Sequence, residues 1–255
     1  MPIDDAELIG QGGFGLVYKV KHKYLEQFFA IKIFRQHPFS TGIHDKERFF
    51  KEANILFNLS HPAIIRIYDI GLYNDKPFIK MEYFQGKNLN EILVRYGRIK
   101  YDKALRLVKT IADALSYAVE KLGVVHRDLK PSNVMAAIPE RFKVIDFGLG
   151  IYIEDELRTR LTQTGETVAS SAYTAPELQA NPQLINCACD IYSLGAIWYE
   201  CLLGRVPQGT GIEEALNAEI NVPPAHKKVI LRSLQFDPNK RFRNWNEFQT
   251  AISDL

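Results

Sequence analysis

The sequence predicts an α+β fold in which strands dominate the first third of the chain and helices dominate the rest. Short apolar runs rich in β-branched and aromatic residues fill the first third, and such runs are typical of strands. Further along, residues 102–122 repeat apolar side chains every three or four positions, which indicates an amphipathic helix. A chain of 255 residues, 46% hydrophobic and 24% charged, can bury a sizeable core in one large domain or two small lobes.

The charge balance does not indicate a protein that binds nucleic acids or anionic membrane surfaces. The 32 basic and 30 acidic side chains leave a formal net charge of +2, so we expect no nucleic-acid partner. Three cysteines are too few for a disulfide scaffold, and the spacing of Cys187 and Cys189 does not match a zinc site. The N-terminus lacks the regions of a signal peptide, and the most apolar window, residues 191–203, is too short to span a bilayer. We expect a cytoplasmic protein without a membrane segment, and secretion by a route without a signal stays open.

Residues 9–17 carry closely spaced glycines and lead into a strand. Glycine lets the backbone approach a ligand closely, so the N–H groups of such a run can point at phosphate oxygens. A dinucleotide-binding glycine run opens a helix. Here residues 16–20 continue as a strand, which leaves a phosphate-binding turn and a plain hairpin as the alternatives. The glycines are Gly10, Gly12, Gly13 and Gly15.

Residues 28–34 predict an apolar strand that carries one lysine. Because side chains alternate between the two faces of a strand, Lys32 shares its face with Ala30, Phe28 and Phe34. A lysine in such surroundings needs a counterion or a phosphate. The alternative is a lysine that points outward from an edge strand.

The next elements follow the same two patterns. Residues 45–59 predict a helix with Asp45 as its N-cap, and residues 64–72 and 77–83 predict two more strands. The helix at 102–122 stops at a glycine, and residues 190–203 predict a buried helix. The first of these helices carries an apolar stripe made of Phe49, Ala53, Leu56 and Leu59.

Two stretches of the middle third, residues 126–133 and 144–148, place polar side chains between short apolar runs. Apolar runs of that length indicate buried strands, so the polar groups lie on the turns between them. The carboxylates of Asp128 and Asp146 suit a divalent cation with phosphate and a base for a hydroxyl. Taken singly, Asp128 could cap a turn and Asn133 could form an Asx-turn. Those alternatives do not explain why all the polar residues fall in one ordered frame.

Together these stretches resemble the motifs of protein kinases, specifically the eukaryotic-like Ser/Thr kinases. The segment His126-Arg127-Asp128-Leu129-Lys130-Pro131-Ser132-Asn133 is similar to the catalytic loop, and Asp146-Phe147-Gly148 is similar to the metal-binding loop. The resemblance covers residues 9–241. It implies a bilobal protein kinase fold with a β-rich N-lobe at residues 1–81, a hinge at 82–87 and a mainly helical C-lobe at 88–255.

The resemblance implies roles for the polar residues. Asp128 fits the base that accepts the proton of the substrate hydroxyl, and Lys130 fits the cation that neutralises the transferring phosphoryl group. Asn133 and Asp146 fit the ligands of Mg²⁺. Lys32 is expected on the α- and β-phosphates of ATP, with Glu52 as its ion-pair partner. Glu47 competes for that partnership but lies too far before His61-Pro62 to match the family spacing.

The resemblance also implies an ATP site. The glycine-rich run from Ile9 would cover the phosphates, and Met81 would be the gatekeeper at the back of the adenine pocket. Asn88 stands where many members carry an acid for the ribose, which suggests a looser ribose contact. Adenine would be sandwiched by Val17, Ala30 and Met135 and hydrogen-bonded by the backbone of Glu82 and Phe84.

Residues 146–177 resemble an activation segment that ends in Ala175-Pro176-Glu177. Thr162-Gln163-Thr164 lies at the offset of the paired phosphothreonines in bacterial receptor-type kinases. The resemblance therefore suggests a bacterial member that autophosphorylates, with Arg127 pairing the phosphate. The alternative is a plain solvated loop. The segment also contains Thr159 and Thr167, and Ala169-Ser170 replaces the common Gly-Thr.

In the last third, the resemblance implies two buried polar contacts. Asp190 would accept N–H bonds from the catalytic loop, and Arg241 would pair with Glu177.

The resemblance also implies a stacked apolar column, to which His126, Phe147 and Leu56 would belong.

The expected function is that of an ATP- and Mg²⁺-dependent Ser/Thr kinase acting on a protein substrate and autophosphorylating its activation loop. One alternative is a nucleotide-binding pseudokinase or partner-regulated scaffold, but Lys32, Asp128 and Asp146 are all present. A small-molecule kinase usually lacks the Ala-Pro-Glu segment that this chain has. Because Ser132 stands where basic-directed kinases hold an acid, no basic consensus is expected. The sequence assigns neither the substrate nor the oligomeric state.

Overall fold

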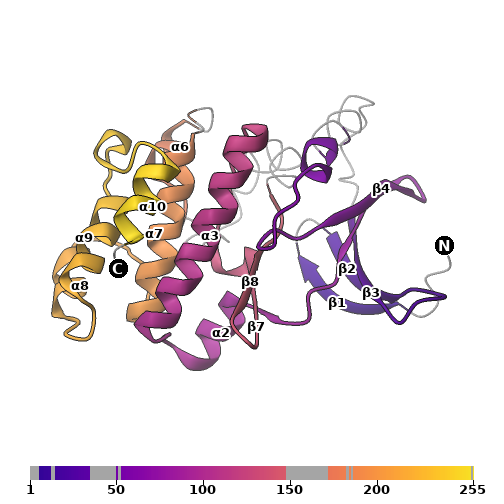
Figure 1. Ribbon diagram of the computed structural model, residues 1–255, viewed down its shortest axis with the longest axis horizontal. Helices are drawn as coiled ribbons and strands as arrows, with labels where there is room; N and C mark the ends of the chain where they lie inside the picture. Colours follow the sequence, from indigo (N-terminus) through magenta and orange to yellow (C-terminus); the bar gives the residue numbers. More distant parts are fainter. Residues whose placement is uncertain are drawn as a thin grey trace. The chain divides into compact units, whose positions relative to one another are not determined.

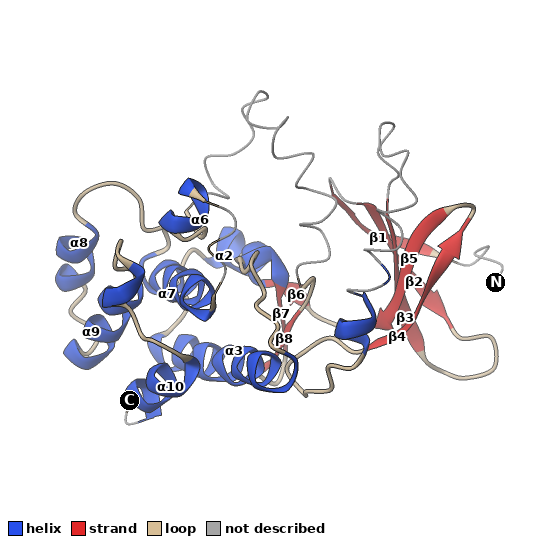
Figure 2. Ribbon diagram, turned by 90° about the horizontal axis from the view of Figure 1, so that it is seen from above, coloured by secondary structure: helices blue, strands red, loops and turns tan. Residues whose placement is uncertain are grey.

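The computed structural model describes residues 6–12, 15–34, 50, 53–147, 172–181, 184, 186–253 and 255. The described residues form two compact units, one ending at Gln85 and the other beginning at Gly86 (Figure 1). The first unit is built on strands and the second mainly on helices (Figure 2). This confirms the expected α+β, bilobal fold.

The first unit contains a five-stranded antiparallel sheet in the order β1-β2-β3-β5-β4. The turn between β4 and β5 places Asn74 and Asp75 at φ of 48° and 60°, which is the left-handed pair that a tight hairpin of two central residues requires. The strands are β1 Glu7–Gly12, β2 Gly15–Lys21, β3 Phe28–Phe34, β4 Ile67–Tyr73 and β5 Lys76–Glu82.

Two predicted elements of the first unit have shifted or partly described ends. Strand β4 begins at Ile67 and not at residue 64, because Ile64 is part of a turn in which its N–H donates to the carbonyl of His61 at 3.0 Å. Residues 53–57 are helical, and Ala53 and Leu56 are buried as expected. Residues 45–49, 51 and 52 of the predicted helix, which include Asp45, Glu47, Phe49 and Glu52, lie outside the described residues.

The second unit opens with a capped helix and a small sheet. Strands β6 Lys87–Asn88, β7 Val134–Ala137 and β8 Arg141–Val144 pair antiparallel in that order. The remaining elements are α2 Leu89–Tyr96, α3 Tyr101–Leu122, the 3₁₀ turns η1 Pro131–Asn133 and η2 Pro238–Lys240, α6 Pro176–Ala180, α7 Cys187–Leu203, α8 Ile212–Ala218, α9 Pro224–Ser233 and α10 Trp245–Ser253.

Helix α7 is the centre of the second unit. Helices α3, α9 and α10 pack against it (Figure 1), and nearly all of its residues are buried. It begins at Cys187, three residues earlier than predicted, because the side chain of Asn186 accepts a hydrogen bond from the Ala188 N–H at 2.8 Å and caps the helix. Helix α3 ends as predicted, at Gly123 with φ of 65°.

None of the helices in the described ranges is both long enough and apolar enough to cross a bilayer.

His226 is a buried polar group between two helices. Its ring lies edge-on to Trp198 of α7, with ring centroids 5.8 Å apart, and edge-on to Tyr101 of α3, at 6.0 Å. Only 5% of the residue is exposed, and neither ring nitrogen has a hydrogen-bond partner among the described residues. Burial, and then the charge of Lys109, lower the pKa of His226 below its ordinary 6.5.

Acidification should therefore destabilise the second unit through His226. A lowered pKa means that the folded state binds fewer protons there than the unfolded state, so stability is lost as the pH falls below about 6.5. The midpoint of urea unfolding of this unit, followed by tryptophan fluorescence, should fall less steeply with pH in His226→Phe than in the wild type. Replacement of the half-buried His22 of the first unit, by His22→Gln, is the control. Parallel pH profiles for the wild type and His226→Phe would contradict this role.

Candidate active site

The loop that follows α3 is held by one buried carboxylate of α7. Asp190, which is 1% exposed, accepts the backbone N–H of His126 at 2.6 Å and that of Arg127 at 2.9 Å. Arg127 has a φ of 71°, a left-handed conformation that costs a non-glycine residue about 1–2 kcal/mol. Burial raises the pKa of Asp190, and the two N–H donors oppose that shift. The predicted contact of Asp190 with this loop is confirmed.

His126 links the loop to the segment after β8. Its ring packs on Phe147 with centroids 4.7 Å apart, as predicted for two members of the apolar column. The ring Nδ1 accepts the Asp128 N–H at 3.3 Å, and Nε2 lies 3.0 Å from the carbonyl of Ile145. A neutral imidazole with its proton on Nε2 satisfies both contacts. Leu56, the third member, is buried in the first unit.

Asp128, Lys130 and Asn133 form one connected group. The Lys130 Nζ lies 2.8 Å from Asp128 Oδ2, and both side chains are about a quarter exposed, at 24% and 23%. The Asn133 Nδ2 donates to the carbonyl of Asp128 at 2.8 Å and to its Oδ2 at 3.1 Å. The carboxylate of Asp128 is therefore held from two sides, and its remaining exposure leaves it accessible to a substrate.

Asp146 lies at the same end of the β7–β8 pair as Asn133. Val134 faces Val144 in that pair, and the Ile145 N–H donates to the carbonyl of Asn133 at 3.0 Å. This bond ties the residue before Asp146 to Asn133. Asp146 itself has a φ of 57°. The backbone thus brings the two predicted metal ligands into adjacent positions.

The chemistry of these donors fits Mg²⁺. A carboxylate and an amide oxygen are hard ligands, and Mg²⁺ in proteins is commonly bound by one or two carboxylates together with waters and substrate phosphates. Among the described residues there is no cluster of three or more His, Cys, Asp or Glu side chains that could hold an ion. The site therefore suits a cation that takes the rest of its ligands from a phosphate.

The first unit brings the predicted nucleotide-binding residues together by strand register. Gly10 faces Val17, Val17 faces Lys32, and Ala30 faces Met81, so β1, β2, β3 and β5 carry these residues side by side. Ile9 and Gly12 lie in β1, whereas Gly13 lies outside the described residues.

Gly15 and Lys32 fit tightly into this sheet. A Cβ at Gly15 would lie 2.2 Å from the carbonyl oxygen of Ile33, so only glycine fits at this position. Lys32 is 8% exposed, with its Nζ 5.3 Å from the centre of the Phe34 ring. Its predicted partner Glu52 lies outside the described residues, so that ion pair stays a prediction.

The end of β5 is fixed to the backbone at Arg66. The Glu82 N–H donates to the carbonyl of Arg66 at 2.8 Å, and the Glu82 Oε2 accepts the Arg66 N–H at 3.4 Å. Phe84, two residues on, is buried. Because the N–H of Glu82 is already bonded, an adenine contact at this residue would use its carbonyl.

Asn88 has a structural task that the sequence analysis missed. Its Oδ1 accepts the Glu91 N–H at 2.9 Å, and its Nδ2 donates to Glu91 Oε1 at 2.6 Å, which caps α2. The signal was present in the sequence as an N-cap residue followed three positions later by glutamate. Met135, the predicted third adenine contact, lies in β7 opposite Asn88.

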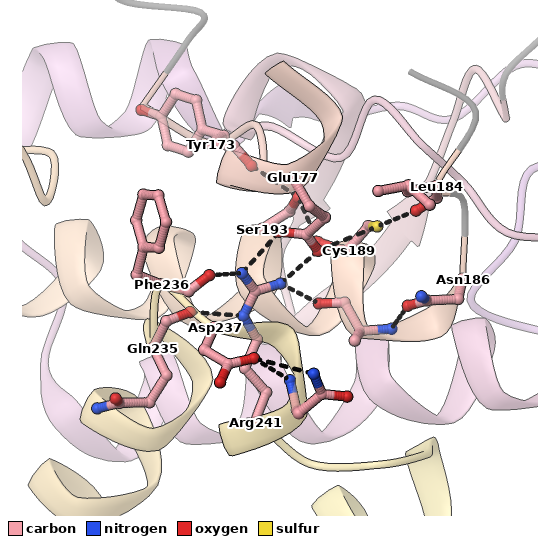
Figure 3. Close-up of polar contacts among 12 residues, drawn as sticks. Tyr173, Glu177, Leu184, Asn186, Cys189, Ser193, Gln235, Phe236, Asp237 and Arg241 are labelled. Atoms are coloured by element: carbon pink, nitrogen blue, oxygen red, sulfur yellow. Dashed lines mark hydrogen bonds and ion pairs between the residues drawn. The ribbon is translucent and has the colours of Figure 1, made fainter. Parts of the chain in front are cut away.

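Arg241 and Glu177 form the predicted buried ion pair (Figure 3). The guanidinium donates from Nη1 to Glu177 Oε1 at 2.7 Å and from Nη2 to Oε2 at 2.8 Å. Its other N–H groups reach the carbonyls of Gln235, Phe236 and Ala188, so all five donors are satisfied. Burial opposes ionisation of Glu177, but the bonds from Arg241 prevail and hold its pKa below the ordinary value.

Further contacts around Ala175-Pro176-Glu177 were not predicted. The Tyr173 hydroxyl donates to Glu200 at 2.6 Å, Ser193 Oγ donates to the carbonyl of Tyr173 at 2.7 Å, and the Cys189 thiol lies 3.4 Å from Glu177 Oε1. Burial raises the pKa of Cys189 to about 12, so the thiol acts here as a neutral donor. No local sequence pattern predicts a contact between Tyr173 and Glu200, which are 27 residues apart. Thr159, Thr162, Thr164, Thr167 and Ala169-Ser170 lie outside the described residues.

Comparison with known proteins places this geometry in context. The sequence model of the protein kinase domain family matches residues 3–255 of this chain. A probable serine/threonine-protein kinase of Clostridium acetobutylicum is 34% identical over 98% of this chain, and the kinase PrkC of Bacillus subtilis is 32% identical over 96%. The chain spans only 39% of the length of each of these relatives.

Solved structures show the same fold. The kinase domain of Mycobacterium tuberculosis PknI is 24% identical, with a TM-score of 0.75 over 97% of this chain and 94% of that chain. Rad53 in complex with AMP-PNP is 25% identical, with a TM-score of 0.75 over 95% of this chain and 62% of that one.

The buried ion pair should make Arg241 hard to replace even by lysine. A lysine keeps the charge but cannot serve both carboxylate oxygens and three carbonyls, so Arg241→Lys should cost on the order of 3–5 kcal/mol in the free energy of unfolding. Arg232→Lys is the control, because its ion pair with Glu247 is 42% and 35% exposed and should contribute less than about 1 kcal/mol. Urea titration measures both, and equal small losses would show that the pair is not a structural anchor.

Proposed function

The chain belongs to the protein kinase family, and from that premise we propose that it transfers the γ-phosphoryl group of ATP to serine or threonine hydroxyls of a protein substrate. The observation that carries the proposal is the connected group of Asp128, Lys130 and Asn133. The relatives named as serine/threonine-protein kinases support the choice of acceptor. Because they are more than twice as long as this chain, the activity and substrates of the whole protein are part of the proposal.

Asp128 is proposed as the base. Lys130 and Asn133 orient its carboxylate, which accepts the proton of the attacking hydroxyl as the oxygen–phosphorus bond forms. The ammonium of Lys130 then stands beside the transferring group and offsets its negative charge. The backbone bonds from His126 and Arg127 to Asp190 fix the loop that carries Asp128, so the base does not need to reorganise during the reaction.

Asn133 and Asp146 are proposed as the ligands of Mg²⁺, which would supply positive charge to the β- and γ-phosphates. Lys32, with Glu52 as its partner, is proposed to bind the α- and β-phosphates. The remaining proposed ATP contacts are the backbone at Ile9, Gly10, Gly12, Gly13 and Gly15, the apolar side chains Val17, Ala30 and Met135, the gatekeeper Met81, the carbonyl of Glu82 and the backbone of Phe84.

The domain boundaries proposed for this function are an N-lobe at residues 1–81, a hinge at 82–87 and a C-lobe at 88–255. The boundary between the two compact units falls between Gln85 and Gly86, inside the proposed hinge. A cytoplasmic location stays part of the proposal.

Replacement of the base should separate binding from chemistry. Asp128→Asn keeps the size and hydrogen-bonding positions of the side chain but removes its basicity, so transfer from labelled ATP to a generic acceptor such as casein should fall by about 10²–10⁴. Binding of a fluorescent ATP analogue should change little. Asp102→Asn, on the exposed face of α3, is the matched control.

Two outcomes would contradict that assignment. If Asp128→Asn transfers phosphate at the wild-type rate, Asp128 is not the base. If the wild type binds ATP and Mg²⁺ but phosphorylates nothing, the chain is a nucleotide-binding pseudokinase.

The activation segment gives a second test. If Arg127 binds a phosphate carried by this segment, the double variant Thr162→Ala with Thr164→Ala should transfer phosphate at least about tenfold more slowly than the wild type. Loss of one charge-assisted hydrogen bond corresponds to a rate change of about that size. The steady-state rate is measured after preincubation with MgATP. Thr159→Ala with Thr167→Ala is the control pair in the same segment. An unchanged rate in the first double variant would show that the segment acts without phosphate on these residues.

A further inference from the structure

The loop between α7 and α8 exposes a threonine between two glycines. Gln208, Gly209, Thr210 and Gly211 are four consecutive exposed residues. Gly209 and Gly211 have φ values of 72° and 87°, which glycine adopts without strain. Pro207 before the loop and Leu216 after it are buried. The loop therefore displays Thr210 on a short, fully solvated stretch with fixed ends.

Most other hydroxyls of the described chain are already engaged. In the helices, Thr250 Oγ1 donates to the carbonyl of Asn246 at 2.8 Å and Thr110 Oγ1 to that of Arg106 at 2.8 Å. Outside the helices, Ser60 and Thr210 are the exposed serine and threonine residues of the described ranges. Within those ranges the hydroxyl of Thr210 makes no hydrogen bond. Among the described residues outside the helices, Thr210 and Ser60 are therefore the two exposed serine or threonine acceptors, and they differ in local sequence.

The local sequence of Thr210 shares a Thr-Gly pair and a nearby acid with the activation segment. A threonine followed directly by glycine occurs at Thr41, Thr164 and Thr210, and only Thr210 of these lies among the described residues. Thr164-Gly165 is followed by Glu166 and Thr210-Gly211 by Ile212-Glu213, so an acid follows within three residues of each threonine. Gln163 directly precedes Thr164, whereas Gly209 precedes Thr210 and Gln208 lies one position further back. Ser60 is followed by His61-Pro62 and shares none of this.

We propose that Thr210 is a second autophosphorylation site, phosphorylated by another copy of this chain. A cleft that accepts Thr164-Gly165 meets the same shape at Thr210-Gly211, because glycine presents no side chain after the acceptor. Helix α8 begins two residues after Thr210, and it lies across α7 from β7 and β8 in both views (Figures 1 and 2), so the loop that leads into α8 is on the other side of α7 from the strand pair next to the catalytic loop. The inference rests on the proposed kinase function.

The transfer is a single substitution at phosphorus. The Thr210 Oγ1 forms a bond to the γ-phosphorus of ATP, and the bond from that phosphorus to the β,γ-bridging oxygen breaks. ADP leaves with the electron pair of the broken bond. The hydroxyl proton passes to the Asp128 carboxylate of the other copy and then to solvent.

An isotope-labelled Asp128→Asn chain, which cannot phosphorylate itself, is the acceptor in the test. It is incubated with unlabelled wild type and MgATP, and its peptides are mapped by mass spectrometry. We expect one phosphoryl group on Thr210, none on Ser60, and none on either residue when the wild type is left out. Adding Thr210→Val to the acceptor should abolish the signal from that peptide and leave phosphorylation at Thr164 unchanged.

A second acceptor variant tests the role of the glycine. A Cβ at Gly211 would come no closer than 3.8 Å to Glu214, and asparagine is one of the few residues that visit a left-handed φ, so Gly211→Asn is the substitution that strains this loop least. It adds a side chain after the acceptor and should reduce the phosphate on Thr210 several-fold. Equal phosphorylation of the two acceptors would overturn the argument from shape.

The remaining outcomes separate this inference from the function on which it rests. Phosphorylation of Thr164 and of casein without any at Thr210 would overturn the second site alone. Phosphorylation of Ser60 to the same extent as Thr210 would also overturn it, because exposure alone would then select the acceptor. Transfer to neither the acceptor chain nor casein would overturn the proposed function and the site with it.

Discussion

The carboxylate of Asp190 is the interaction on which the catalytic loop depends. A buried carboxylate without partners is costly, and a left-handed arginine backbone is strained. The N–H groups of His126 and Arg127 give the buried carboxylate its hydrogen-bond partners. The same two bonds hold the strained backbone of Arg127 in its left-handed conformation. Because Asp190 lies on α7, which α3, α9 and α10 enclose, the position of Asp128 is set by the helical core of the second unit.

Arg241 anchors a second part of the same unit by the same means. Its guanidinium joins Glu177 at the start of α6 to the carbonyl of Ala188 in α7 and to the loop that precedes η2. Each donor has an acceptor, so the burial of the charge is compensated by hydrogen bonds as well as by the opposite charge. Asp190 lies on α7, and Glu177 is linked to α7 through Arg241 and the carbonyl of Ala188. The polar residues at the start of α7 can therefore be buried because each has hydrogen-bond partners.

The sequence predicted what depends on periodicity or on a pair of charged residues. Helix α3, strand β3 and the shared face of Ala30 and Lys32 follow from apolar spacing, and the contacts of Asp190 and Arg241 follow from family motifs. The contact of Tyr173 with Glu200 was missed because it joins residues far apart in the sequence and leaves no periodic signal. The cap formed by Asn88 and Glu91 was missed for a different reason: its local pattern was present, but Asn88 was assigned only to a ligand contact.

The two units fix their candidate residues by different physical means. In the second unit, Asp128, Lys130 and Asn133 touch one another, so loss of one changes the surroundings of the others and their effects should not be additive. In the first unit, Val17, Ala30 and Lys32 are placed by strand register, which survives the loss of a single side chain. Changes in the first unit should therefore act on the affinity for a nucleotide one residue at a time. Substitutions in the second unit should have coupled effects on the rate of phosphate transfer, because Asp128, Lys130 and Asn133 are joined by hydrogen bonds.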